Sequence, residues 1–190
     1  LEASKLIKLK HLIYASSSSV YGDSKKFPVS EEFETSLPLS LYASTKKSNE
    51  VLAYSYSSIY KLPITGLRLF TIYGPYGRPD MALYKFTDAV IRSKKINLYN
   101  YGNHNRDFTY IDDLVMVMIK LLNKKPKGKI PNTIFNVGYG KSIKLKNFLH
   151  EIEKCINKKT KINKANIQKG DVIKTHSDIK KINNTLSFRP

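Results

Sequence analysis

The 190-residue sequence contains little of several residue types that would define a class of protein. Its one cysteine, Cys155, rules out an internal disulfide and favours a reducing cytoplasm; we expect it to pack inside an apolar-periodic helix. No apolar run approaches the length of a membrane span, and residues 1–10 mix charged with apolar side chains, unlike a signal peptide. The four histidines have no metal-ligand spacing. We therefore expect a cytoplasmic protein with no membrane segment and no metal.

Acidic residues are also scarce: Asp and Glu number 15 against 33 Lys and Arg, which gives a formal net charge of +18. A positive charge of this size can indicate a nucleic-acid-binding protein. Here the lysines are spread along the chain, and no basic arm or nucleic-acid motif accompanies them. We therefore expect no nucleic-acid partner. A milder interpretation is that part of the charge attracts an anionic small ligand.

The hydrophobic pattern predicts an α/β fold. Apolar runs at residues 11–16 and 64–70 indicate buried strands, and a helical pattern lies between them at residues 42–60. Two strands joined by a long crossover are typical of a βαβ unit in a parallel sheet. Further helices are predicted at residues 81–94, 111–123, 142–156 with Ser142 as N-cap, and 177–183, and further strands at 96–99, 133–137 and 161–162. We divide the chain near Gly74, as a change of layer within one compact unit.

One pair of residues could carry chemistry. Tyr42 and Lys46 form a Tyr-x-x-x-Lys motif, which places both side chains on one face of the predicted helix. An ammonium beside a phenol favours the phenolate, which can act as a general base. Upstream, residues 16–19 are four serines that close a predicted strand, where the carboxyl ends of parallel strands line a ligand crevice. Alone, the Tyr-x-x-x-Lys spacing in so lysine-rich a chain favours a solvated helix face. The serine run alone is equally compatible with a serine-rich turn.

Taken together, the strand-end serines, the loop and the Tyr-x-x-x-Lys helix resemble the extended short-chain dehydrogenase/reductase family, and the resemblance covers essentially the whole chain. Residues 71–82 (TIYGPYGRPDMA) are similar to a signature of UDP-glucuronate 4-epimerases. Further matches, in the family's order, are residues 99–102 (YNYG), 106–113 (RDFTYIDD), 136–138 (NVG) and 170–172 (GDV). The resemblance implies a partial Rossmann-like parallel sheet, the second half of an NAD-binding domain, over residues 1–74. It implies a smaller α/β region that binds a nucleotide sugar over residues 75–190.

The resemblance also implies roles for individual residues. Tyr42 would be the general base, Lys46 would hold the nicotinamide ribose of NAD, and Ser17 would bond the reacting sugar hydroxyl. The other implied contacts are Ser16 with the cofactor, Ser18 and Ser19 with the sugar, Thr71 and Arg78 with a sugar carboxylate, Arg106 with the UDP diphosphate, Leu98 and Tyr99 with the uracil, and Asp171 with Gln168 near the uridine ribose. The residue types leave alternatives open: Leu98 and Tyr99 as core residues, Arg78 as a loop arginine that satisfies carbonyls, and Arg106 as a surface partner of Asp107.

The implied reaction is NAD-dependent 4-epimerisation of a UDP-sugar, UDP-glucuronate to UDP-galacturonate, through a 4-keto intermediate. A 4-keto glucuronate is a β-keto acid that loses carbon dioxide unless its carboxylate is held, a role that the resemblance gives to Thr71 and Arg78. Related decarboxylases carry Glu where Ser19 stands, and sugar dehydratases carry an Asp-Glu pair where this chain has Ser18 and Ser19. Two alternatives stay open: a 4-epimerase of neutral UDP-hexoses of the UDP-glucose/galactose type, and a catalytically inactive protein that binds nucleotide sugars.

This sequence has no counterpart of the family's first βαβ unit, whose Gly-x-x-Gly-x-x-Gly loop binds the dinucleotide. We therefore expect the chain to be the C-terminal portion of a longer product. We also expect it to be aggregation-prone and inactive alone, because truncation uncovers a parallel sheet that is normally buried. Relatives commonly dimerise through a four-helix bundle that would use the helix at residues 42–60, so we expect a homodimer at full length.

Overall fold

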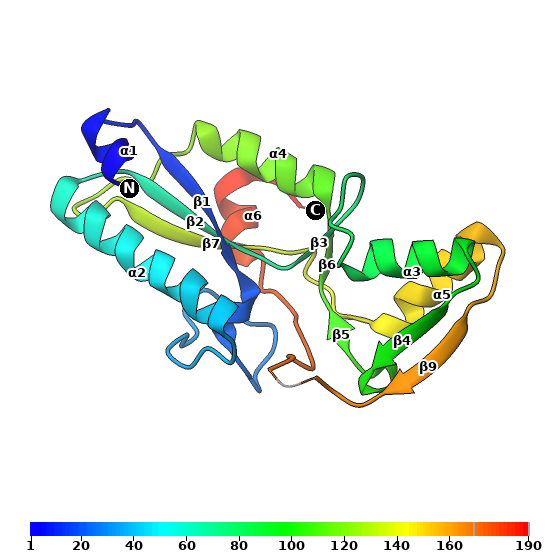
Figure 1. The fold of residues 1–190 in the computed structure, drawn as a ribbon. Helices are drawn as coiled ribbons and strands as arrows, with labels where there is room; N and C mark the ends of the chain where they lie inside the picture. The colour runs from blue at the N-terminus through cyan, green and yellow to red at the C-terminus, as the bar shows by residue number, and fades with distance from the viewer. Residues whose placement is uncertain (169, 190) are drawn as a thin grey trace.

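A computed structural model describes residues 1–168 and 170–189 of the chain. The fold consists of a sheet with helices on both faces and a smaller outlying region of two strands and two helices (Figure 1). The strands of the sheet are β1 (Leu12–Ser17), β2 (Ile64–Leu69) and β7 (Asn132–Val137). The helices that pack near it are α1 (Glu2–Leu6), α2 (Leu41–Tyr60), α4 (Ile111–Leu122) and α6 (Lys180–Leu186).

The sheet is parallel throughout, in the order β1-β2-β7. The central strand β2 is buried along almost its whole length, as expected for a strand with helices on both sides. The predicted α/β class and parallel sheet are therefore confirmed. The division of the chain near Gly74 does not separate the elements of the sheet from the rest. Three elements that follow residue 74 pack at this sheet: α4, β7 and α6.

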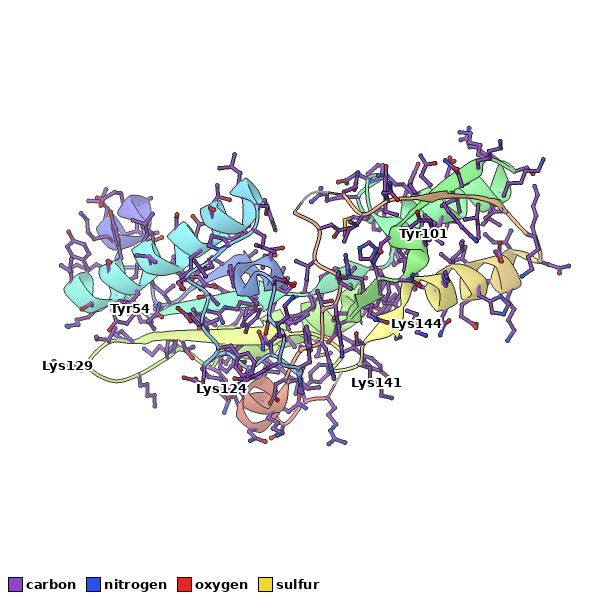
Figure 2. The ribbon with its side chains drawn as sticks, turned by 90° about the horizontal axis from the view of Figure 1, so that it is seen from below. Tyr54, Tyr101, Lys124, Lys129, Lys141 and Lys144 are labelled. Atoms are coloured by element: carbon purple, nitrogen blue, oxygen red, sulfur yellow. The ribbon has the colours of Figure 1, made fainter. Side chains whose placement is uncertain are left out.

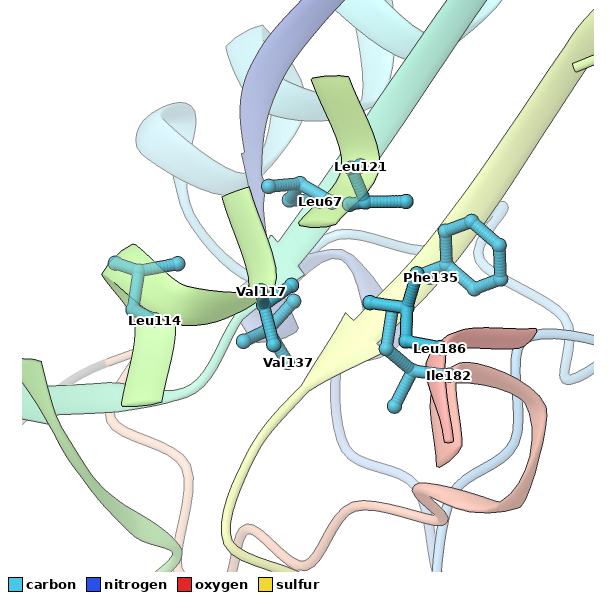
Figure 3. Close-up of a cluster of buried hydrophobic side chains, with 8 residues drawn as sticks. All are labelled: Leu67, Leu114, Val117, Leu121, Phe135, Val137, Ile182 and Leu186. Carbon is cyan, nitrogen blue, oxygen red and sulfur yellow. The ribbon is translucent and has the colours of Figure 1, made fainter. Parts of the chain in front are cut away.

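One face of the sheet holds the largest hydrophobic core, which Figure 3 shows in close-up. Side chains from β2, β7, α4 and α6 meet there: Leu67, Leu114, Val117, Leu121, Phe135, Val137, Ile182 and Leu186. On the other face, α2 packs Ala53 against Leu62 and Ile64. The crossover helix is thereby fixed beside β1 and β2, and this fixes the position of its first turn.

The outlying region contains β4 (Lys95–Tyr99), β9 (Lys161–Ala165), α3 (Ala82–Ile91) and α5 (Leu145–Ile156). β4 pairs with β9 in parallel and buries alternate residues, Ile96 and Leu98, against the two helices. Short paired strands connect this region to the sheet: β3 (Thr71–Tyr73) with β6 (Phe108–Tyr110), and β5 (Asn105–Arg106) with β8 (Ile143–Lys144). Two 3₁₀ helices, η1 (Ser18–Tyr21) and η2 (Asn100–Gly102), complete the elements.

Three expectations about local structure were wrong. Ser142 does not cap α5, which begins at Leu145; its hydroxyl donates instead to the carbonyl of Thr175 at 2.8 Å. The last helix begins at Lys180 and not at Ser177, whose N–H and hydroxyl both donate to a buried carboxylate. Cys155 is exposed and not packed, because it lies to one side of the buried stripe of α5.

The surface lysines do not gather on one element. The lysines labelled in Figure 2 lie in the segment between α4 and β7 (Lys124 and Lys129), in the turn after β7 (Lys141) and on β8 (Lys144). No helix within residues 1–168 and 170–189 has the length and hydropathy that a membrane crossing requires. Within the same residues, no cluster of three or more His, Cys, Asp or Glu side chains could hold a metal ion.

Candidate active site

The serine run lies at the carboxyl end of β1, where the chain turns into η1. Ser17 is the N-cap of this 3₁₀ helix: its Oγ accepts from the N–H of Ser19 at 3.1 Å and donates to the Ser19 hydroxyl at 3.1 Å. Ser17 is only 7% exposed. The strand end and the cap together therefore hold the hydroxyl of Ser17 in one place at the edge of the sheet.

The Tyr-x-x-x-Lys motif lies in the first turns of α2. Ser40 caps this helix, because its Oγ accepts from the N–H of Ala43 at 3.2 Å. Tyr42 is 52% exposed, and the Nζ of Lys46 lies 5.8 Å from the centre of its ring. The same Nζ donates to the carbonyl of Ala15 in β1 at 2.9 Å. Lys46 therefore ties α2 to the end of β1 while its positive charge stays beside the phenol.

A cavity of about 550 Å³ brings the two motifs together. Its lining includes eight of the predicted site residues: Ser16, Ser17, Ser18, Ser19, Tyr42, Lys46, Thr71 and Arg78. The segment after β3, residues 74–78, forms another wall, and it also borders an adjoining apolar cavity of about 560 Å³. The cavity has the position expected of a ligand crevice, at the carboxyl ends of parallel strands.

Arg78 reaches this cavity from an exposed position. Its guanidinium pairs through two nitrogens with the carboxylate of Asp80, and both side chains are more than half exposed. An exposed ion pair of this kind is worth ~0–1 kcal/mol. A ligand carboxylate inside the cavity could therefore exchange with Asp80 at little cost.

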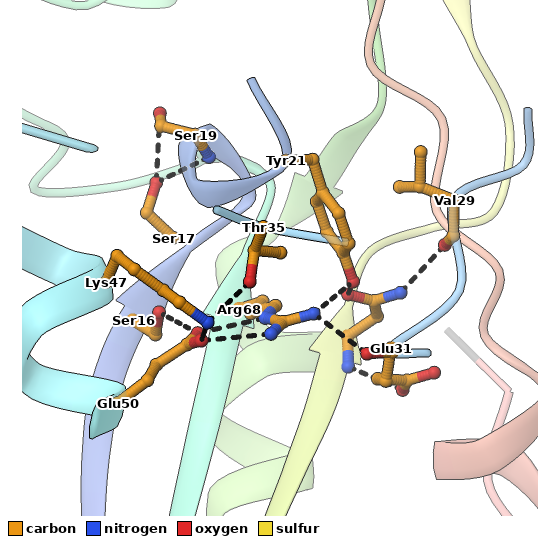
Figure 4. A network of polar contacts seen from close by, with 11 residues as sticks. Ser16, Ser17, Ser19, Tyr21, Val29, Glu31, Thr35, Lys47, Glu50 and Arg68 are labelled. Atoms are coloured by element: carbon orange, nitrogen blue, oxygen red, sulfur yellow. Dashed lines mark hydrogen bonds and ion pairs between the residues drawn. The ribbon is translucent and has the colours of Figure 1, made fainter. Parts of the chain in front are cut away.

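Behind the serines lies a buried ion pair that the sequence reasoning missed (Figure 4). Arg68 of β2 donates to both carboxylate oxygens of Glu50 of α2, from Nε and Nη2, at 2.9 Å each. Ser16 donates its hydroxyl to the same carboxylate at 2.7 Å. The predicted contact of Ser16 with a cofactor would therefore use its main chain, because its hydroxyl is already engaged. Burial opposes ionisation of Glu50, but the hydrogen bond and charge of Arg68 overcome it and the pKa of Glu50 is lowered.

The network continues from Arg68 across the sheet. Its Nη1 donates to the hydroxyl of Tyr21 at 3.0 Å, and Tyr21 donates to Oδ1 of Asn136 in β7 at 2.6 Å. Burial is the main cause that raises the pKa of Tyr21, to about 12. Asn136 in turn donates twice to the segment before α2, from its backbone N–H to Oε1 of Glu31 and from its side-chain amide to the carbonyl of Val29. A continuous set of hydrogen bonds thus runs from α2 to β7 behind the serines that line the cavity.

A sequence signal for this network exists. Glu50 has the helical spacing of the buried residues Ala43, Ala53 and Ser57, so it is a charged residue on the buried face of α2. Arg68 is likewise a charged residue inside an otherwise apolar strand. Two opposite charges at buried positions of neighbouring elements predict an ion pair.

The remaining predicted residues do not line this cavity and lie around β4, β5 and the segment 170–178, here called the strap. Arg106 donates from Nη2 to Oδ1 of Asp171 at 2.8 Å and from Nη1 to the carbonyl of Ile173 at 3.1 Å. Its partner is therefore Asp171, and the alternative of a surface pair with Asp107 was wrong. Gln168 is exposed, and its carbonyl accepts from the N–H of Asp171 at 3.2 Å.

The two residues of β4 divide between core and surface. Leu98 is 2% exposed and belongs to the core of the outlying region, whereas Tyr99 is 37% exposed on the opposite face of the strand. The core alternative holds for Leu98 and not for Tyr99. Any contact of Leu98 with a base would therefore run through its main chain.

Asp107 holds the strap in place, a role without any sequence signal beyond its position beside Arg106. It is fully buried, and its carboxylate accepts from both the N–H and the hydroxyl of Ser177 and from the N–H groups of Tyr139 and Gly140. Burial raises the pKa of Asp107, and these hydrogen bonds act in the opposite direction. The carboxylate of Asp107 thus holds the strap, which carries Asp171, close to Arg106.

Comparisons with known proteins show the family to which the chain belongs. A model of the NAD dependent epimerase/dehydratase family matches residues 1–138. The chain is 39% identical over 205 residues to the probable UDP-glucuronate 4-epimerase of Rhizobium meliloti, which covers 100% of this chain and 60% of that protein. It is 43% identical over 204 residues to protein CapI of Staphylococcus aureus, with coverage of 100% and 61%.

A solved structure gives the same result. The UDP-glucuronic acid 4-epimerase from Bacillus cereus, in complex with UDP-glucuronic acid and NAD, matches with a TM-score of 0.92 at 35% identity, over 100% of this chain and 59% of that one. The chain therefore belongs to the NAD dependent epimerase/dehydratase family, and the resemblance inferred from its motifs is confirmed. It spans about three-fifths of the length of these relatives, 60% and 61% of the two curated proteins.

Proposed function

We propose that the full-length protein catalyses NAD-dependent 4-epimerisation of a UDP-sugar, and that the sugar is UDP-glucuronate, converted to UDP-galacturonate. The observation that carries the proposal is the cavity in which Tyr42, Lys46, Ser17 and Arg78 meet. A probable UDP-glucuronate 4-epimerase and a solved UDP-glucuronic acid 4-epimerase both match the whole of this chain. The activity would be cytoplasmic, with no nucleic-acid or membrane partner.

The residues present fit a dinucleotide at this cavity. The ammonium of Lys46 makes one hydrogen bond within the part of the chain that the structure describes, to Ala15, and an ammonium has further hydrogens to donate. Those donors suit the hydroxyls of a nicotinamide ribose. NAD, when bound, would supply the hydride acceptor for the sugar and return the hydride to it.

Tyr42 transfers the proton, and Ser17 orients the hydroxyl that loses it. Tyr42 takes the proton of the sugar's C4 hydroxyl as the 4-keto sugar forms and returns a proton when the opposite configuration is made. The ammonium of Lys46 stays beside Tyr42 during this step, with its Nζ 5.8 Å from the ring centre. Ser17, held by its cap hydrogen bonds, orients the reacting hydroxyl.

The acidic sugar is supported by Thr71 and Arg78, which line the same cavity. A hydroxyl and a guanidinium can hold the C5 carboxylate of the β-keto acid intermediate and so suppress its decarboxylation. The nucleotide end is supported by Arg106, Tyr99 and Asp171 of the outlying region and the strap, with Gln168 close by.

The direct test is an NAD⁺-dependent conversion assay on the full-length protein with UDP-glucuronate and UDP-glucose offered separately. We expect turnover of UDP-glucuronate, and a loss of about 10²-fold or more in kcat for Tyr42→Phe, because the general base is removed. Tyr60→Phe is the matched control, since Tyr60 is on the same helix and is 47% exposed. Equal activity of the two variants would contradict the role of Tyr42.

A second candidate, 4-epimerisation of a neutral UDP-hexose, is favoured by one observation: Arg78 already has a carboxylate partner in Asp80. Arg78→Met separates the two. With UDP-glucuronate as substrate the variant should raise KM strongly, whereas a neutral sugar should be unaffected. Arg92→Met is the control, because Arg92 is also an exposed arginine paired with an aspartate, Asp88, and lies at the C-cap of α3. Turnover of UDP-glucose alone would reject the acidic substrate and keep the mechanism.

We also propose that the full-length protein is a homodimer that uses α2, whose exposed residues include Val51, Leu52, Tyr54 and Ile59. Sedimentation of the full-length protein checks this: a monomer at micromolar concentration would contradict it. The 190-residue chain alone should aggregate and show no turnover, and soluble monomeric material that epimerises UDP-glucuronate would contradict that expectation.

A further inference from the structure

His104 is a buried histidine that the mechanism above does not use. It lies between η2 and β5 and is 2% exposed. Its Nε2 is 3.2 Å from Oδ2 of Asp171, but the alignment gives no hydrogen bond, and Nε2 has no partner within residues 1–168 and 170–189. A buried ring nitrogen without a partner is costly, so its presence needs an explanation.

The imidazole is surrounded by the predicted nucleotide-binding residues. The charged groups that face it are Asp171 from the strap and Arg106 from β5. The carbonyl of Tyr99 in β4 also interacts with the ring and favours its charged form. From α5, the side chain of Lys146 lies against Gly102, two residues before His104.

The two oxygens of Asp171 have different partners. Oδ1 accepts from Arg106 at 2.8 Å, whereas Oδ2 is the oxygen near His104. A protonated imidazole carries a hydrogen on both ring nitrogens, so protonation guarantees a donor at Nε2 and adds an attraction between opposite charges. Both carboxylate oxygens would then be engaged inside the protein.

We propose that His104 is a positioning residue for Asp171: its neutral ring leaves Oδ2 open to a ribose hydroxyl, and its protonated ring draws that oxygen away. The inference rests on the proposed function, in which Asp171 binds the ribose of a uridine nucleotide. It adds a prediction that the site residues alone do not make. Affinity for the nucleotide falls as His104 takes up a proton.

The range of pH follows from the surroundings of the ring. Burial and the charge of Arg106 lower the pKa of His104, while Asp171 and the Tyr99 carbonyl act in the opposite direction. The pKa therefore lies on the acid side of the usual value of about 6.5. The ring is neutral above that value, so binding is strongest there and weakens as the pH falls through the pKa of His104.

The experiment measures UDP affinity of the full-length protein by calorimetry from pH 7.5 down through the titration midpoint of His104, as NMR gives it. A hydrogen bond to a charged group corresponds to about tenfold in affinity, so the unmodified protein should lose about tenfold more affinity over this range than His104→Gln, which cannot gain a proton. His150→Gln is the control, because His150 is an exposed histidine of α5. It should retain the pH dependence of the unmodified protein.

A second measurement needs no variant. The imidazole of His104 is titrated by NMR in the presence of uridine or of 2′,3′-dideoxyuridine, which lacks the ribose hydroxyls. Uridine should lower the titration midpoint, and the dideoxy compound should leave it unchanged. Equal midpoints, or equal pH dependence in the unmodified protein and His104→Gln, would overturn the role of His104 and leave the proposed function standing. Absence of UDP binding at every pH would refute both.

Discussion

The ion pair between Glu50 and Arg68 gives the sharpest stability prediction. Glu50→Gln leaves the guanidinium of Arg68, which is 4% exposed, without a compensating charge. Removing one partner of a buried ion pair costs about 3–5 kcal/mol, and we expect about 3 because the amide oxygen still accepts one hydrogen bond. Urea unfolding of the full-length protein, monitored by circular dichroism, measures this change in the free energy of unfolding.

A control and a double variant separate charge from packing. Glu151→Gln removes an exposed carboxylate of α5 and should change stability by less than about 0.5 kcal/mol. Combining Glu50→Leu with Arg68→Met removes both charges, and the double variant should be more stable than Glu50→Leu alone. A loss for Glu50→Gln no larger than that of the control would refute the reasoning, because it would mean that the buried charge of Arg68 needs no partner.

The same pair predicts a pH dependence with a definite sign. Since the pKa of Glu50 is lowered in the folded protein, its contribution to stability is present above the unfolded pKa, about 4.3, and is lost as the pH falls through the folded value. The difference in stability between the unmodified protein and Glu50→Gln should therefore shrink in acid and be constant at neutral pH. A difference that grows in acid would contradict this assignment.

Two further substitutions test packing. Leu121→Ala, in the core shown in Figure 3, should lower the free energy of unfolding by about 3 kcal/mol. Leu122→Ala, at a side chain that is 65% exposed, should lower it by less than about 0.5 kcal/mol. Equal losses in thermal unfolding would contradict the assigned orientation of α4. Gly138→Ala should destabilise by about 2 kcal/mol or more, because the added methyl group would lie 2.2 Å from the hydroxyl of Ser177. The loss caused by Gly138→Ala should be smaller in a Ser177→Gly background than in the unmodified chain, and equal losses in the two backgrounds would show that this contact is not the cause.

The sequence predicted the elements whose pattern is local. The strand ending at the serines, the helix ending at Tyr60 and the strand after Pro63 have strong periodicity and clear terminators, and all three lie within a residue or two of their predicted ends. The strands β3, β5, β6 and β8 could not be found in this way. They have two or three residues each and exist through pairing with distant segments.

Among the site residues, too, contacts within a short stretch of sequence were predicted and contacts between distant segments were not. Residues in one short stretch, such as Tyr42 and Lys46, were predicted together and lie together. The partner of Arg106 was not predicted, because 65 residues separate it from Asp171. The strap that brings Asp171 there has little regular structure of its own, and it is placed by the buried carboxylate of Asp107. No periodicity encodes such a contact.

The position of β1 has a consequence for how the cleft is completed. Within the described residues β1 pairs with β2 alone, so its other side presents N–H and C=O groups that no strand engages, although the carbonyl of Ala15 in this strand accepts from Lys46. This strand also ends at Ser17. A parallel strand added there would run about 4.8 Å from β1 and would release its following loop directly beside that hydroxyl. A segment that paired with the open side of β1 would therefore place its following loop at the cavity that Ser17 and Tyr42 line.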